Sequence, residues 1–139
     1  MNVKVKRLHP DAILPHYDYV GDAGLAMYAL EGATIPVGGR QKFDCGWALE
    51  FDANYVAKVF DRSSMGAKGL KTMGGVFDSN CRGEYNAILV NLSGAPNEVK
   101  KGDKVAQLVL IAIGNAEFAE VTELSASARS DKRFGSTGR

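Results

Sequence analysis

The sequence predicts an all-β protein, a barrel or jelly roll built from short strands. Short apolar runs recur at near-regular intervals along the 139 residues, as they do in all-β sandwiches and barrels. No segment keeps the 3.6-residue apolar period of a long amphipathic helix. Glycines and prolines between the runs supply turns. These patterns favour one domain whose strands enclose a single core.

The expected strands follow one another with short connections. Val3 and Val5 alternate with lysines, so the first strand is expected to have one wet face. Later strands are expected in segments 25–29, 34–37, 41–51, 55–60, 85–91, 105–113 and 118–122. Trp47, inside the 41–51 strand, is expected in the core or at a subunit interface. One short helix is expected at 63–67, where a strand runs into Arg-Ser-Ser.

Composition excludes several classes of protein. The 17 Lys and Arg residues nearly balance the 16 Asp and Glu residues, leaving a net charge of +1, so a general nucleic-acid-binding role is not expected. No apolar run approaches the roughly 20 residues of a membrane helix. The N-terminus lacks the apolar block of a secretory signal, so we expect a cytoplasmic protein. The two cysteines and two histidines show no metal-ligand spacing.

The chain is organised around the segment 74–84. Gly74 and Gly75 precede a short apolar pair and a lone carboxylate, Asp78, and Gly83 permits a reversal before the next apolar run. The pattern predicts a β-hairpin with Asp78 at its mouth.

Three other segments carry groups suited to phosphate. Arg62 offers a guanidinium fork beside the hydroxyls of Ser63 and Ser64. Gln107 is a polar amide within an apolar strand and needs a partner if buried. In the tail, the ring of Phe134 precedes Gly135, Ser136 and Thr137, and Arg129 adds charge. Phosphate-binding groups, an aromatic ring that can stack on a base and a single carboxylate together favour nucleotide hydrolysis. Asp78 would deprotonate the attacking water, and Mg²⁺ would be held mainly by the phosphates.

These segments occur in the order of five motifs found in the homotrimeric deoxyuridine triphosphatases (dUTPases), and the chain resembles that family over nearly its whole length. Segment 22–25 is similar to the first motif, and 62–64 with Met65, Gly66 and Lys68 is similar to the second. Segments 75–78 and 82–84 resemble the third motif, and 102–108 resembles the fourth. Arg129 with 134–138 resembles the fifth.

The resemblance implies a jelly-roll β-barrel of the dUTPase type in residues 1–124, with a mobile C-terminal arm, 125–139, that closes the site. It implies Mg²⁺-dependent hydrolysis of dUTP to dUMP and pyrophosphate, by Asp78-activated water attack at the α-phosphate. It also implies a homotrimer with shared sites, and neither membrane nor nucleic-acid partners are expected. The substrate-binding residues implied are Arg62, Ser63, Ser64 and Gln107 for phosphate, Gly75, Val76, Phe77, Cys81 and Gly83 for the nucleoside, and Arg129, Phe134, Gly135, Ser136 and Thr137 for the lid.

The chain departs from the family pattern at several positions. Ala26 stands where the first motif has Asp, and Cys81 stands where the third motif has a Tyr that packs on the sugar. Ser130, Lys132 and Arg133 replace glycines of the fifth motif, so a stiffer, more cationic arm is expected. Two alternatives therefore stay open: an enzyme for another pyrimidine deoxynucleotide, and a weakly active paralogue that acts as a nucleotide-responsive binding module.

Overall fold

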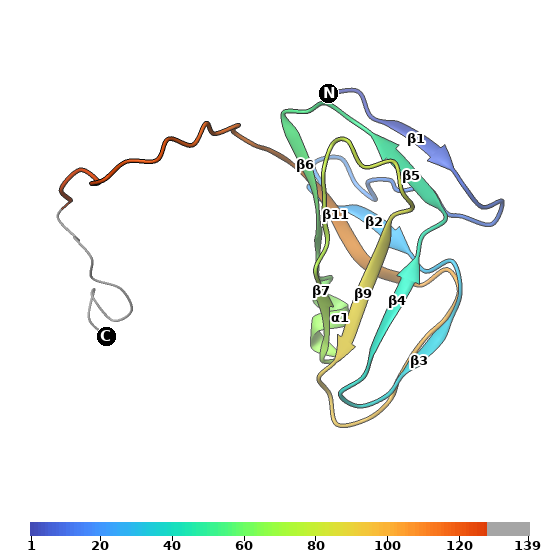
Figure 1. Ribbon diagram of the computed structural model, residues 1–139. Helices are drawn as coiled ribbons and strands as arrows, with labels where there is room; N and C mark the ends of the chain where they lie inside the picture. The colour runs from blue at the N-terminus through green and yellow to red at the C-terminus, as the bar shows by residue number, and fades with distance from the viewer. Residues whose placement is uncertain (128–139) are drawn as a thin grey trace.

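The computed structural model describes residues 1–127, which form β-strands with a single short helix in that range (Figure 1). The predicted all-β class is confirmed. The helix, α1, spans Ser63–Ala67, as predicted. The strands are β1 (Lys4–Arg7), β2 (Leu25–Tyr28), β3 (Ala33–Ile35), β4 (Arg40–Asp44), β5 (Trp47–Glu50), β6 (Tyr55–Phe60), β7 (Leu70–Met73), β8 (Val76–Phe77), β9 (Asn86–Asn91), β10 (Asn97–Val99) and β11 (Lys104–Ala112).

All strand pairs are antiparallel and non-sequential neighbours are common. One sheet has the order β2-β11-β6-β8, and a second has the order β4-β9-β7. Two smaller sheets pair β1 with β5 and β3 with β10. Within residues 1–127 the pairings thus form four sheets rather than one continuous closed ladder. β11 is the central strand for function, because it lies between β2 and β6 and brings their ends together.

The core lies between these sheets and follows the alternation of the strands. In β9, Ala87 and Leu89 are buried while their neighbours in sequence are half-buried, as the two-residue period of a strand requires. Trp47 is fully buried within the chain, so of its two expected positions, core or subunit interface, the structure supports the core. Each large apolar side chain buried in this way contributes about 1.5–3 kcal/mol to folding.

Two of the expected strands are wrong. The 41–51 strand is divided into β4 and β5, because Gly46 adopts φ +74° between them and the two halves then pair with different strands. Segment 118–122 forms no strand: residues 113–127 leave β11 as an exposed, extended run away from the sheets (Figure 1), and Phe118 is 98% exposed. No neighbouring strand within residues 1–127 pairs with this segment, so its apolar residues form no ladder.

The expected hairpin around Asp78 also differs. β8 pairs with β6, whereas β9 pairs with β4 and β7. Segments 75–77 and 84–86 therefore do not pair with each other, and the expected hairpin is not formed. β7 and β10 were not expected from the sequence.

No helix in the described part of the chain is long and apolar enough to cross a membrane.

Candidate active site

A polar pocket of about 570 Å³ opens where α1 meets the ends of β2 and β6 and the middle of β11. It contains charges of both signs: the Arg62 guanidinium and three aspartates, two from the segment before β2 and one from the end of β6. The lining residues are Asp18, Asp22, Ala23, Gly24, Ala26, Asp61, Arg62, Ser63, Gly66 and Gln107. Three sequence motifs, 22–25, 62–64 and 102–108, thus contribute to one pocket.

Arg62 lies directly before α1, where the chain leaves β6. Its backbone is extended, with φ −88° and ψ 139°, and its carbonyl accepts from the N–H groups of Met65 and Gly66. The guanidinium Nη1 donates to the carbonyl oxygen of Lys104 at 3.0 Å. This bond holds the guanidinium beside β11, and its remaining N–H groups are suited to anionic oxygens.

Gln107 finds the partner that its position in the strand requires. Its Nε2 donates to the carbonyl oxygen of Asp61 at 2.8 Å, joining the middle of β11 to the end of β6. The amide lies against Gly24, where an added Cβ would come within 2.4 Å of Oε1 of Gln107. The glycine at position 24 therefore makes room for the amide.

Asp61 directly precedes Arg62 and also lines the pocket. Its Oδ1 accepts from the backbone N–H of Thr72 at 2.7 Å and from the Thr72 hydroxyl at 2.6 Å, and its Oδ2 pairs with Lys71. Burial raises the pKa of this carboxyl, but the bonds from Lys71 and Thr72 outweigh it and hold the pKa below its ordinary value. Asp61 is thus an ionised anchor that ties β6 to β7.

Asp18 enters the pocket from the irregular segment before β2. Its Oδ2 is 2.5 Å from Nζ of Lys104, and its Oδ1 is 3.5 Å from Nε2 of His16. The hydrogen bond from Lys104 lowers the pKa of the Asp18 carboxyl. The His16 ring stacks on Tyr28, and its Nε2 lies 3.2 Å from the Tyr28 hydroxyl. His16 thus has a structural place in this cluster.

The Asp78 segment rests on a stack of aromatic rings that rises from the core. Trp47 stacks on Tyr85 at 4.9 Å between ring centroids, and Tyr85 stacks on Phe77 at 4.2 Å. Phe77 is followed by the exposed Asp78, whose carbonyl accepts from the N–H of Cys81 at 3.0 Å in a turn. The stack thus holds in place Phe77, the residue directly before Asp78.

Arg82 closes the same turn. Its Nη1 donates to the carbonyl oxygens of Ser79 at 2.7 Å and Cys81 at 3.0 Å. Its Nε lies 3.7 Å from Oε2 of Glu50, which also pairs with Lys4 at 2.5 Å. The turn after Asp78 is therefore braced by side-chain bonds as well as by its own backbone.

Asp78 and the pocket are at opposite ends of β6. Phe77 pairs with Ala57, so Asp78 continues towards Val56, whereas Arg62 follows the other end of the strand, beyond Phe60. Val56 and Phe60 are about 13 Å apart at ~3.3 Å per residue. Figure 1 agrees: the loop before β9 lies near the top of the view, and α1 lies lower, beside the other end of β9. Within one chain, Asp78 does not line the pocket.

The structure thus divides the residues predicted for the site. Arg62, Ser63 and Gln107 meet in the pocket, while Ser64 is exposed on α1 and is not among the lining residues. The nucleoside group clusters around Asp78; it comprises Gly75, Val76, Phe77, Cys81 and Gly83. The residues predicted for the lid, Arg129, Phe134, Gly135, Ser136 and Thr137, lie outside the described residues. Sequence reasoning missed Asp18, because nothing in its irregular segment indicates contact with the second and fourth motifs.

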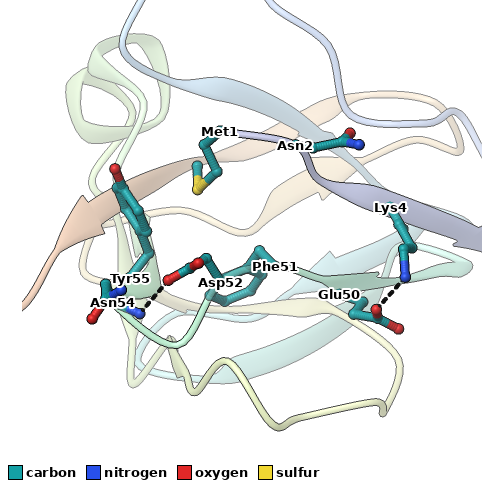
Figure 2. Close-up of a pocket in the computed structure, with 8 residues that line it drawn as sticks. All are labelled: Met1, Asn2, Lys4, Glu50, Phe51, Asp52, Asn54 and Tyr55. Atoms are coloured by element: carbon teal, nitrogen blue, oxygen red, sulfur yellow. Dashed lines mark hydrogen bonds and ion pairs between the residues drawn. The ribbon is translucent and has the colours of Figure 1, made fainter.

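A second pocket of about 640 Å³ lies beside the N-terminus and the turn between β5 and β6 (Figure 2). Its polar groups already bind one another: Lys4 pairs with Glu50, and the N–H of Asn54 donates to Oδ1 of Asp52 at 2.8 Å. No predicted site residue in the described range lines it. We therefore place the candidate active site at the first pocket and at Asp78.

Within residues 1–127, fold and pocket define an all-β protein with a polar pocket of mixed charge beside a short helix. The chain belongs to the dUTPase family, whose family model matches residues 10–138. The deoxyuridine 5'-triphosphate nucleotidohydrolase of Wolinella succinogenes is 35% identical, and the alignment covers 100% of this chain and 95% of that protein. The enzyme of the same name from Clostridioides difficile is 37% identical, with 99% and 98% covered.

Solved structures agree on the fold. A point mutant of the Staphylococcus bacteriophage 80alpha dUTPase with dUpNHpp has a TM-score of 0.93 at 23% identity, covering 99% of each chain. A mutant dUTPase from phage phi11 of S. aureus, described with a structural Mg(II) ion, has a TM-score of 0.84 at 20% identity. That alignment covers 91% of this chain and 100% of the phage protein.

Proposed function

We infer that this protein is a dUTP diphosphatase, which hydrolyses dUTP to dUMP and pyrophosphate. Full-length relatives at 35% and 37% identity are named deoxyuridine 5'-triphosphate nucleotidohydrolase. One structural observation supports this function most directly. Arg62, Ser63 and Gln107 come from two distant motifs and line the same pocket. Folding thus brings three groups suited to phosphate into one pocket, which supports the proposal.

The phosphate half of the site is the pocket beside α1. The Arg62 guanidinium provides charge and paired N–H donors for phosphate oxygens, and the Ser63 hydroxyl adds a further donor. Gln107 uses one N–H on Asp61 and keeps a second for a ligand. We propose that these groups hold the triphosphate and stabilise the charge that moves onto the leaving pyrophosphate.

The hydrolytic half is the turn that carries Asp78. We propose that the Asp78 carboxylate accepts a proton from a water molecule as that water attacks the α-phosphorus. The new bond joins the water oxygen to the α-phosphorus, and the bond from that phosphorus to the bridging oxygen breaks. The electron pair leaves with pyrophosphate. The aromatic stack below Phe77 and the bonds from Arg82 support the fixed position this role needs.

The pocket fits a magnesium ion carried by the substrate. Mg²⁺ prefers oxygen ligands and usually takes only one or two carboxylates, with phosphates and water completing its shell. The pocket offers carboxylates and a serine hydroxyl, and no three His, Cys, Asp or Glu side chains in residues 1–127 converge as a metal-binding group. We propose that the phosphates supply most of the ligands; the ion would neutralise their charge.

We further propose that the active site is shared between subunits of a homotrimer. Asp78 and Arg62 lie at opposite ends of β6 and cannot meet within one rigid chain. A cyclic assembly would bring the Asp78 turn of one subunit to the pocket of its neighbour. The C-terminal arm, which is proposed to contribute Phe134, belongs to the same assembly.

The function is tested by pyrophosphate release with Mg²⁺ from dUTP, UTP, dCTP and dTTP. We expect dUTP to be the best substrate and an Asp78→Asn variant to lose at least about 10²-fold in kcat, as expected for loss of a general base. Competitive turnover of UTP or dCTP would instead favour the alternative substrate suggested by Cys81. Unchanged turnover by Asp78→Asn would contradict the role of Asp78.

Sharing of the site is tested by mixing two inactive variants. Asp78→Asn and Arg62→Gln chains are unfolded together, refolded and assayed against each variant refolded alone. If sites combine Asp78 and Arg62 from different subunits, about a quarter of the sites in a random 1:1 mixture regain both residues. A mixture as inactive as its components would show that each site uses one chain.

A further inference from the structure

We propose that Asp18 makes the phosphate pocket selective for the magnesium complex of the triphosphate over the metal-free triphosphate. The proposal rests on the proposed function and adds to it a residue outside the sequence motifs. Asp18 is a positioning residue in this scheme: it acts through the cation and its water shell, and not on the reacting phosphorus.

The first observation is the place of Asp18 in the pocket. Asp18 and Arg62 line the same cavity, and they approach it from segments 44 positions apart in the sequence. The Asp18 carboxylate is exposed and paired with Lys104 at 2.5 Å, so it repels the oxygens of a metal-free triphosphate, although Lys104 offsets part of that repulsion. The same carboxylate attracts a triphosphate that carries a divalent cation. The sign of its effect therefore depends on the metal.

The second observation is that Lys104 fixes both charges. Its ammonium binds Oδ2 of Asp18 at 2.5 Å, and its carbonyl oxygen accepts from Nη1 of Arg62 at 3.0 Å. One residue at the start of β11 thus sets an anionic group and a cationic group at separate positions in the cavity. The bond from Lys104 also lowers the pKa of Asp18, so the carboxyl stays ionised at neutral pH.

The third observation separates Asp18 from the other two carboxylates of the pocket. Asp61 is committed to Thr72 and Lys71 through both oxygens. Oδ2 of Asp22 accepts from the backbone N–H of Tyr19 at 2.9 Å and closes a local turn. Oδ1 of Asp18, in contrast, has only the long 3.5 Å contact to His16 among the described contacts. Oδ1 of Asp18 and Oδ1 of Asp22 are thus the carboxylate oxygens of the pocket left for a ligand among the described contacts, and of these two residues only Asp18 also shares Lys104 with Arg62.

The fourth observation concerns the neighbouring position in β2. The backbone N–H of Ala26 donates to the carbonyl of His16 at 3.1 Å, so the segment carrying Asp18 packs alongside the strand carrying Ala26. Ala26 lines the pocket with a methyl group and adds no charge of its own. Asp18 brings a carboxylate to the same pocket from the adjacent segment.

The test measures binding without turnover. A non-hydrolysable imido analogue of dUTP is titrated calorimetrically into the full-length protein, with Mg²⁺ and with EDTA, and the ratio of the two affinities is the readout. We expect Asp18→Asn to reduce this ratio about 10- to 100-fold, the usual effect of removing an outer-shell partner on metal affinity. The affinity for the metal-free analogue should stay the same or rise. Asp18→Glu keeps the carboxylate and is expected to retain part of the ratio.

Asp11→Asn is the matched control, because Asp11 also pairs with a lysine, Lys101 at 2.8 Å, but lies outside the pocket. It is expected to leave the ratio unchanged, and thermal unfolding verifies that every variant folds. An unchanged ratio in Asp18→Asn overturns the proposal, as does an equal loss of affinity with and without Mg²⁺, which would indicate a merely structural role. If the wild-type protein fails to bind the analogue under both conditions, the proposed function itself is overturned.

Discussion

Gly24 and Gln107 pack so closely that no side chain fits between them: a Cβ at position 24 would lie 2.4 Å from Oε1 of Gln107. The contact joins the segment before β2 to the middle of β11 and sets the position of the amide. Because the amide also donates to Asp61, the glycine helps to keep three segments of the pocket in register.

We therefore expect Gly24→Ala to displace the Gln107 amide and break its bond to Asp61. The end of a flexible side chain can move, so the main effect should be a several-fold rise in KM for dUTP, with a stability loss of about 1 kcal/mol, the value of one net hydrogen bond. Steady-state kinetics and thermal unfolding measure the two effects. Gly94→Ala, where an added Cβ meets nothing within 4 Å, should change neither; equal effects of both substitutions would refute the contact.

Asp61 should contribute an acid-sensitive share of stability. Its pKa in the folded protein lies below the ordinary value of 3.8, so its contribution is complete above that value and is lost as pH falls through the lower folded pKa. We expect Asp61→Asn to cost about 1–3 kcal/mol near pH 7, as for charge-assisted bonds. The difference in free energy of unfolding between Asp61→Asn and the wild-type protein should become smaller below about pH 4.

Denaturant unfolding at a series of pH values measures this difference in free energy of unfolding. Glu123→Gln, in the exposed extended run, is the control and should leave the free energy of unfolding near pH 7 unchanged. A difference for Asp61→Asn that stays constant from pH 7 down to strongly acidic pH would contradict the linkage.

The two thiols should differ sharply in reactivity. Cys45 is 1% exposed, and burial raises the pKa of its thiol to about 12, so little reactive thiolate forms at pH 8. Cys81 is half-buried in the turn after Asp78. Iodoacetamide should label Cys81 alone in the native protein and both thiols after unfolding, as mass spectrometry of the peptides will show.

Labelling of Cys81 should also weaken binding of the imido analogue of dUTP, because the added group occupies the nucleoside side of the proposed site. Cys81→Ser removes the native label and serves as the control. Native labelling of Cys45 would show that the core around Trp47 opens more readily than its burial indicates.

The Tyr85 hydroxyl is buried and has no hydrogen-bond partner among the described residues. An unsatisfied buried hydroxyl is costly, so Tyr85→Phe should leave stability unchanged or raise it by about 1 kcal/mol. The ring contacts with Trp47 and Phe77 remain. Tyr28→Phe is the matched comparison: its hydroxyl lies 3.2 Å from His16, and its removal should destabilise. Strong destabilisation by Tyr85→Phe in thermal unfolding would reveal a partner for the hydroxyl.

Local sequence patterns predicted much of this fold. Apolar runs at 85–91 and 105–113 identified β9 and β11, and Arg-Ser-Ser after an apolar strand identified α1. Prediction failed where pairing decides the outcome. Segment 118–122 contains apolar residues typical of a strand but has no neighbouring strand among the described residues, and the run 41–51 bends at Gly46 and joins two sheets.

The sequence by itself determined the all-β class, the chemistry of the motifs and the family, because these depend on residue type, spacing and order along the chain. Only the tertiary structure decided that Asp18 enters the pocket of Arg62 and Gln107, and that Asp78 is at the other end of β6. Both results depend on strand order and register. These follow from packing and hydrogen bonds between distant segments, which no local pattern records.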